Sequence, residues 1–263
     1  MEERDLLAGH IRDLAGRTAG NDYLTHTAFL TLEEQSFVQR LLRQDAFAGT
    51  DRLLTGGYPE ADRRVLLFLP SYMDRGMAEE AAEDADGGIL PFVCLRVRPA
   101  NARFTDHPGH RDYLGALMHL GVRREMIGDI LPGEEEAYLF VMKSIAETVE
   151  QELTQVRHTT VEVARVPAAQ CSAQIRTQEM RGSIASERID ALLAMVWKLS
   201  RSDAQKLIEK ELVYAGGSLV TSASYTPREG ERISVRGYGK FLYLGCAGST
   251  RKGRLIAQVR YFV

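Results

Sequence analysis

The sequence has few of the residues that build cross-linked or metal-stabilised folds. Only three of its 263 residues are cysteines, and Cys94, Cys171 and Cys246 are far apart with no CxxC pair. This spacing argues against a disulfide framework and against a structural zinc site. The stretch His107–His110 has Pro and Gly between its histidines, which precludes the helical spacing of a metal-binding pair. We therefore expect neither a metal nor a cofactor.

Long hydrophobic segments are also missing. The longest apolar run, Val65–Leu69, is far shorter than the roughly 20 residues that a membrane-spanning helix needs. The first residues, Met1–Asp5, are acidic and lack the pattern of a targeting segment. We expect a monomeric protein of the reducing cytoplasm that is not bound to a membrane.

The overall charge of -3 hides an asymmetry along the chain. Residues 181–263 hold 14 Lys+Arg against 7 Asp+Glu, a net charge of +7, which leaves -10 for residues 1–180. Affinity for a phosphate backbone is chiefly electrostatic. The split favours a nucleic-acid-binding module at the end of an acidic body, although a solvated surface could also carry such charges.

Two short helices are predicted to meet at a basic corner within Lys198–Ile208. Ser186 is expected to cap the first helix, whose apolar residues recur at helical spacing: Ile189, Leu192, Leu193 and Val196. Ser200 and Asp203 fit the capping box of a second helix, whose apolar side is Ala204, Leu207 and Ile208. Each helix buries one face and leaves its cations to solvent or to a ligand.

Short strands are predicted to close this module. Gly216-Gly217 separates two β-prone runs, 212–215 and 218–221, which is a hairpin signal because both turn positions need a positive φ. Residues 231–236 alternate apolar with polar or cationic side chains, and 255–262 form a closing strand.

These residues resemble a known RNA-binding module. The triplet Arg188-Ile189-Asp190, the run Lys198–Ala204, the hairpin and the segment 229–235 are similar to the alpha-L RNA-binding domain first recognised in ribosomal protein S-four. The segment 234–241 resembles one branch, the YlmH family of bacterial RNA-binding proteins, and so do His110–Leu117 and Gly121–Ile130. Two positions depart from the usual domain: Glu211 stands where Gly is common, and Gly216 where Asn is common.

The resemblance implies a non-catalytic protein that recognises structured ribosomal RNA or tRNA. Members of that family look like factors of the large ribosomal subunit, linked to quality control of stalled ribosomes. We expect recognition of RNA shape and backbone by helix-terminal amides, hydroxyl groups and cations. The candidate RNA-binding residues are Arg188, Lys198, Ser200, Arg201, Ser202, Gln205, Lys206, Arg236, Lys240, Arg251 and Lys252.

Arg201 yields the sharpest of these expectations. It is predicted to occupy the first position of the second helix, where a cation is mildly unfavourable with the helix dipole. A bound phosphate would offset that cost. We therefore expect Arg201→Glu to weaken RNA binding and to leave thermal stability unchanged or slightly raised.

Upstream, the order of elements from residue 89 indicates a ferredoxin-like or RNA-recognition-motif fold. The predicted order is strand 92–98, helix 111–120, strand 125–131, strand 137–142, helix 144–156 and strand 160–166. Tyr138 and Phe140 share one strand face, either as base-stacking aromatics or, more plainly, as core.

The predicted architecture is α+β. It has a mainly helical region with one strand at 1–88, a ferredoxin-like domain at 89–170, a linker at 171–182 and the alpha-L domain at 183–263. The linker is predicted from a run rich in Ala, Gln and Ser.

An RNA-modifying enzyme is the alternative. Some pseudouridine synthases carry an alpha-L domain and a catalytic aspartate in an Arg-Leu-Asp run, which Arg188-Ile189-Asp190 resembles. Here the triplet lies inside the predicted helix, and we interpret Asp190 as structural, near the positive end of that helix. Residues 1–175 show no nucleophile or cofactor motif, so we expect no catalytic residue.

Overall fold

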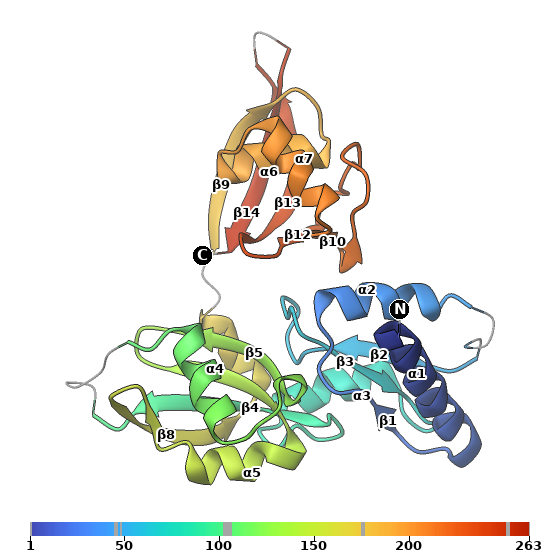
Figure 1. Ribbon diagram of the computed structural model, residues 1–263, viewed down its shortest axis with the longest axis vertical. Helices are drawn as coiled ribbons and strands as arrows, with labels where there is room; N and C mark the ends of the chain where they lie inside the picture. Colours follow the sequence, from blue (N-terminus) through green and yellow to red (C-terminus); the bar gives the residue numbers. More distant parts are fainter. Residues whose placement is uncertain are drawn as a thin grey trace. The chain divides into compact units, whose positions relative to one another are not determined.

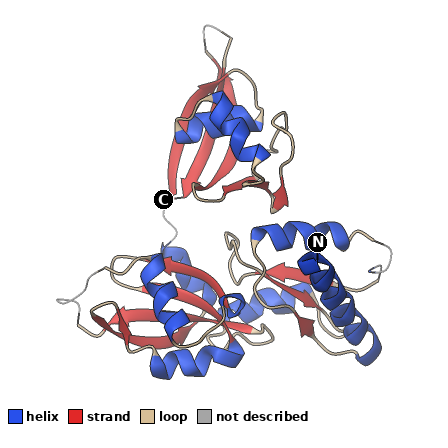
Figure 2. Ribbon diagram, in the orientation of Figure 1, coloured by secondary structure: helices blue, strands red, loops and turns tan. Residues whose placement is uncertain are grey.

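The computed structural model describes residues 2–44, 47, 49–101, 107–174, 177–250 and 253–262. They form two compact units, Met1–Gln174 (unit 1) and Ile175–Val263 (unit 2), each with its own core. Figure 1 labels the helices and strands, and Figure 2 separates the two kinds of element by colour. Helices accompany antiparallel sheets in both units, which confirms the α+β class.

The first part of unit 1 packs two helices on a small sheet. Its elements are α1 (Glu2–Asn21), β1 (Thr25–His26), α2 (Leu32–Leu41), β2 (Arg52–Thr55), β3 (Val65–Phe68), α3 (Arg75–Glu80) and the 3-10 turn η2 (Ala81–Glu83). The sheet order is β1-β3-β2. The prediction of a single strand here is therefore wrong. β1 has only two residues, and β2 is an edge strand that is half-buried along its whole length, so neither shows alternating burial.

Helix α2 begins at a reciprocal pair of side-chain and backbone hydrogen bonds. The Thr31 hydroxyl accepts a hydrogen bond from the Glu34 N–H (3.3 Å), and the Glu34 carboxylate accepts one from the Thr31 N–H (2.7 Å). Each side chain satisfies an amide that the helix start would otherwise leave unpaired. The two bonds together form a capping box.

The second part of unit 1 has the predicted β-α-β-β-α-β order. Its elements are β4 (Phe92–Pro99), α4 (His110–His119), η3 (Arg124–Met126), β5 (Ile127–Pro132), β6 (Ala137–Met142), α5 (Lys143–Glu152), β7 (Gln155–Val156), β8 (Thr159–Val166) and η4 (Ala168–Gln174). The sheet order β5-β6-β4-β8, with every neighbouring pair antiparallel, is that of a ferredoxin-like fold. β7 adds a short edge strand that we did not predict.

The two faces of this sheet have different partners. Val93, Leu95 and Leu139 lie in one core with the buried side chains of α4 and α5. On the opposite face Phe92 and Phe140 are buried against the first part of unit 1. Phe140 is fully enclosed and Tyr138 is 3% exposed, so both are core residues and neither is a base-stacking platform.

A tight junction joins the two parts of unit 1. Gly128 lies under the Phe29 ring so closely that a Cβ there would stand 2.7 Å from a ring carbon. The next residue, Asp129, accepts hydrogen bonds from the Tyr58 hydroxyl (2.6 Å) and from the Asp62 and Arg63 N–H groups (2.7 and 3.0 Å). The Gly128-Asp129 pair therefore holds the first part of the unit on the sheet.

Unit 2 is a six-stranded antiparallel sheet with two short helices on one face (Figures 1 and 2). Its elements are β9 (Thr177–Ile184), α6 (Ile189–Trp197), α7 (Arg201–Glu209), β10 (Val213–Ala215), β11 (Ser218–Leu219), β12 (Arg232–Val235), β13 (Gly239–Ser249) and β14 (Leu255–Phe262). The sheet order is β11-β10-β12-β13-β14-β9. The predicted hairpin, the alternating strand and the closing strand are all present.

The predicted linker at 171–182 is wrong in its second half. Residues 177–184 form β9, which pairs with β14 along its whole length. Most side chains of β9 are exposed because it is an edge strand, so it lacks the apolar alternation by which strands are predicted. Gly182 fits closely under α6, since a Cβ there would stand 2.4 Å from Met195.

The helix pair starts and ends at specific backbone positions. Arg188, not Ser186, is the N-cap of α6, and it makes no side-chain capping bond. Gly216 and Gly217 have φ values of 55° and 81°, as the hairpin turn requires. Glu211 also has a positive φ, 57°, which explains why Gly is common at this position in the alpha-L domain.

Candidate nucleic-acid interface

A buried carboxylate ties the two helices of unit 2 together. Asp190 is fully buried in the first turn of α6. Its oxygens accept hydrogen bonds from the Arg188 guanidinium (3.2 and 3.1 Å), from the Arg201 guanidinium (3.0 and 2.9 Å) and from the Gln205 amide (3.2 Å). We call these four residues the Asp190 clamp. Asp190 therefore joins the start of α6 to α7, as a structural role requires.

Electrostatics keep Asp190 ionised. Burial alone raises the pKa of this carboxyl group, but hydrogen bonds from Arg201, Gln205 and Arg188 outweigh that effect and lower it below the usual value. Arg188 and Arg201 share this single carboxylate, so the clamp keeps one excess positive charge. The sequence analysis expected a bound phosphate to offset the cost of a cation at the start of α7; in the structure Arg201 is paired with a carboxylate eleven residues away on the other helix.

The corner between the helices is built on Lys198 and Ser200. Lys198 has a left-handed backbone conformation (φ 53°, ψ 41°), and α6 ends there with the Leu199 N–H donating to the Ala194 carbonyl (3.0 Å). Its side chain is exposed. Ser200 then caps α7 by accepting from the Asp203 N–H (3.1 Å), as predicted.

Polar side chains surround this cap. The Ser200 hydroxyl lies 2.8 Å from that of Ser202 and donates to the Asp203 carboxylate (2.7 Å). Lys206 forms an ion pair with the other oxygen of Asp203 (2.9 Å). The hydrogen bond from Ser200, together with Lys206, lowers the pKa of the Asp203 carboxyl group. Lys198, Ser200, Ser202 and Lys206 therefore gather at the exposed start of α7, which we call the α7 corner.

Known families match two parts of this chain. Residues 100–170 match the family described as "Putative RNA-binding domain in YlmH", and residues 187–233 match the S4 domain. The second match spans α6, the α7 corner, the hairpin and the start of β12. The chain carries a YlmH RNA-binding domain followed by an S4 domain. This confirms the resemblance seen in the sequence.

Two relatives extend these matches. The chain is 28% identical over 232 residues to the "Ribosome-associated protein quality control protein P2" of Bacillus subtilis (strain 168), covering 87% of this chain and 83% of the relative. It also resembles the structure of "Cell division protein ylmH from Streptococcus pneumoniae", with a TM-score of 0.50 over 65% of this chain and 94% of that one. At 13% sequence identity the second likeness concerns the fold alone.

Other predicted site residues lie outside the α7 corner of the S4 domain. Arg236 is exposed in the turn between β12 and β13, and the Lys240 ammonium lies 5.6 Å from the centre of the Phe262 ring. Arg251 and Lys252 fall outside the described residues. The structure therefore brings most candidates together in the Asp190 clamp and at the α7 corner. It places Arg236 in the turn between β12 and β13, and Lys240 at the start of β13.

The sequence analysis missed an aromatic cluster beside this turn. Trp197 ends α6 directly before Lys198, and its ring contacts the rings of Tyr238, Phe241 and Tyr261. The signal available in the sequence was the single tryptophan of the chain next to a basic corner. Three of the four rings come from different strands or turns, so spacing along the chain does not reveal the cluster.

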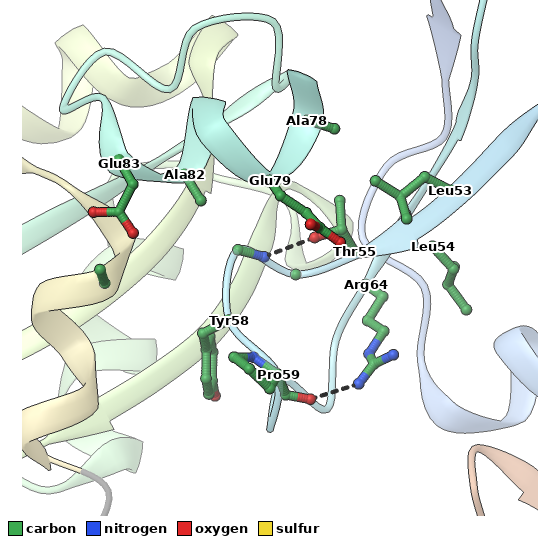
Figure 3. A pocket seen from close by; sticks show the side chains of 13 residues that line it. Leu53, Leu54, Thr55, Tyr58, Pro59, Arg64, Ala78, Glu79, Ala82 and Glu83 are labelled. Carbon is green, nitrogen blue, oxygen red and sulfur yellow. Dashed lines mark hydrogen bonds between the residues drawn. The ribbon is translucent and has the colours of Figure 1, made fainter. Parts of the chain in front are cut away.

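Unit 1 contains a pocket that offers little for chemistry. It has a volume of about 550 Å³ between β2, the turn at 56–59, α3 and η2 (Figure 3). The Thr55 hydroxyl accepts from the Gly57 N–H (3.2 Å), and the Arg64 guanidinium donates to the Pro59 carbonyl (2.9 Å), so these polar groups hold the turn. The described residues that line it include no cysteine, histidine or lysine.

Two buried thiols of unit 1, Cys94 and Cys171, are held in their protonated form. Burial raises the pKa of the Cys171 thiol to about 12 and also raises that of Cys94, which disfavours the nucleophilic thiolate. Within the described ranges, no group of three or more His, Cys, Asp or Glu side chains could hold a metal ion. Among the helices that the structure describes, none is long and apolar enough to cross a membrane.

Proposed function

We propose that this chain binds structured RNA through the α7 corner and acts as a non-catalytic RNA-binding protein of the ribosome. The observation that carries the proposal is the corner itself, where Lys198, Ser200 and Ser202 surround the exposed start of a helix inside the matched S4 domain. A helix start offers amide donors and a partial positive charge to an anion.

The arrangement suits a phosphate backbone. Lys198 is exposed next to the first amides of α7, and the Ser202 hydroxyl lies beside the cap, 2.8 Å from that of Ser200. Asp203 would repel a phosphate, but its carboxylate already forms an ion pair with Lys206 and accepts a hydrogen bond from Ser200. The excess positive charge of the Asp190 clamp adds long-range attraction.

The finer proposal concerns the RNA. We infer structured ribosomal RNA or tRNA on the large ribosomal subunit, in quality control of stalled ribosomes within the cytoplasm. The printed name of the Bacillus subtilis relative supports this assignment, as do the two RNA-binding families that match the chain. Recognition would rest on the shape and backbone of the RNA rather than on base edges.

Lys198→Asn tests the site with little risk to the fold. Asn tolerates the left-handed conformation that Lys198 adopts, so the change removes a charge and keeps the backbone. We expect weaker binding to a structured RNA and a slope of log affinity against log salt reduced by roughly 0.7 to 0.9, the loss of one phosphate contact. The matched control is Lys210→Asn, at the opposite end of α7.

The measurement is a salt titration of RNA binding by full-length wild type and both variants. Equal affinities for wild type and Lys198→Asn would show that the α7 corner is not the binding site. Sedimentation of the protein with separated ribosomal subunits tests the finer proposal. We expect the protein to sediment with the large subunit. If it remains unbound, or sediments with the small subunit alone, the finer proposal is refuted.

A further inference from the structure

The aromatic cluster of unit 2 leaves one ring partly exposed to solvent. The Trp197 ring lies 5.8 Å from Tyr238, 5.6 Å from Phe241 and 6.3 Å from Tyr261, in each case edge to face. Phe241 is fully buried, whereas 41% of Tyr238 is exposed. Trp197 is therefore the centre of the cluster, and Tyr238 packs on it at the solvent side.

The turn that carries Tyr238 is fixed. The Tyr238 N–H donates to the Val235 carbonyl (3.0 Å) across the connection of β12 and β13. Gly237 and Gly239 have φ values of 84° and 117°, and a Cβ at Gly239 would stand 3.2 Å from the Tyr261 hydroxyl. Because side chains rarely adopt these conformations, the glycines permit a turn that presents Tyr238 in one place. An ordered aromatic ring loses little entropy when a flat ligand stacks on it.

Three cations lie close to Trp197 or Tyr238 along the chain. Lys198 directly follows Trp197 and is exposed, and it also belongs to the α7 corner. Arg236 is two residues before Tyr238, and Lys240 is two residues after it. An open aromatic ring among cations is the arrangement on which proteins stack the bases of single-stranded or looped RNA. Shielding of Trp197 alone would explain the packing of Tyr238, but it would not require the neighbouring cations.

We propose that Tyr238 stacks on an unpaired base of the RNA whose phosphates contact the α7 corner. The inference rests on the proposed function and adds a requirement to it: the RNA ligand contains a bulged or looped nucleotide, not only a continuous helix. Trp197 packs edge to face against the Tyr238 ring, and Lys198, the next residue along the chain, belongs to the α7 corner. Stacking is tolerant of base identity because every base has a flat aromatic face.

The test compares two hairpin RNAs that differ by one bulged nucleotide. Trp197 is the only tryptophan of the chain, so its fluorescence reports on this cluster without labelling. Full-length wild type should bind the bulged hairpin more tightly and show a larger change in Trp197 emission with it. Tyr238→Leu should lose about 5- to 150-fold in affinity for the bulged hairpin, the equivalent of roughly 1 to 3 kcal/mol per stacked base.

Two comparisons make the result decisive. Tyr238→Phe keeps an aromatic ring and should retain the preference for the bulged hairpin, while Tyr238→Leu should bind the fully paired hairpin like wild type. The salt slope of Tyr238→Leu should be unchanged, in contrast to Lys198→Asn. Equal binding of both hairpins by wild type, or an equal loss on both by Tyr238→Leu, would overturn the stacking inference. Failure of wild type to bind either RNA would instead contradict the proposed function.

Discussion

Substitution of Arg201 should destabilise unit 2, contrary to what the sequence alone suggests. In the Asp190 clamp, Arg201 donates two of the five hydrogen bonds that reach the buried carboxylate. Arg201→Ala leaves Asp190 with Arg188 and Gln205 only. Arg201→Glu removes the same bonds and places a second negative charge beside a carboxylate that is fully buried.

The cost can be estimated from this geometry. A hydrogen bond to a charged group contributes about 1.5 to 3 kcal/mol, and removing one partner of a buried pair costs about 3 to 5 kcal/mol. The Arg201 side chain is 45% exposed and other donors remain, so solvent screening reduces the estimate to about 2 kcal/mol for Arg201→Ala. For Arg201→Glu we expect a loss nearer the upper figure. A loss of 2 kcal/mol corresponds to a fall in Tm of roughly 8 to 16 °C for a unit of this size.

Thermal unfolding followed by Trp197 fluorescence measures this effect, because the single tryptophan lies in unit 2. The control is Lys206→Ala, whose ion pair with Asp203 is exposed on both sides and should contribute at most about 1 kcal/mol. At roughly 4 to 8 °C per kcal/mol, a Tm for Arg201→Glu within about 2 °C of that of wild type would mean almost no loss of stability. In that case the Asp190 clamp does not stabilise the helix pair. A fall as small as that of Lys206→Ala would lead to the same conclusion.

Two further outcomes follow from buried contacts. Gly128→Ala should destabilise unit 1 by about 1 to 3 kcal/mol because the new methyl group would overlap the Phe29 ring. Gly115→Ala, in open space on α4, should instead stabilise unit 1 by about 0.5 to 1 kcal/mol. Circular dichroism melts in which the Tm of both variants moves in the same direction would refute this reasoning. Because the pKa of Asp190 is lowered in the folded state, its carboxylate contributes fully to folding stability above the unfolded pKa of about 3.9. This stabilisation is lost as the pH falls through the pKa of the folded state. The difference in Trp197-monitored stability between wild type and Asp190→Asn should therefore be large at pH 7 and shrink below about pH 4, and a difference independent of pH would contradict the assignment.

Local signals in the sequence predicted much of this fold. The capping pair Thr31 and Glu34 lies three residues apart and determines the start of α2 by itself. The Gly216-Gly217 turn likewise needs only its own φ values. The ferredoxin-like part follows from apolar runs and turns in a fixed order.

Contacts between distant residues could not be predicted in this way. The partner of Arg201 is Asp190 on another helix, so a cation that looked free along its own helix proved to be paired. Asp129 looked like part of a family motif, and only the fold shows that it receives the Tyr58 hydroxyl from 71 residues away. β9 depends on backbone pairing with β14 rather than on apolar side chains. In each case the decisive neighbour is remote in the sequence.

The pairing of β9 with β14 affects the order in which unit 2 can fold. β9 is the first strand of the unit and β14 the last, and Thr177 lies opposite Phe262. β14 is also an interior strand, between β13 and β9. During synthesis the early strand has no neighbour until Leu255–Phe262 have emerged, and such long-range pairings are slow to form because a large loop must close first. Unit 1 can complete its sheets much earlier in translation, so the two units should become folded at different moments, with unit 2 last.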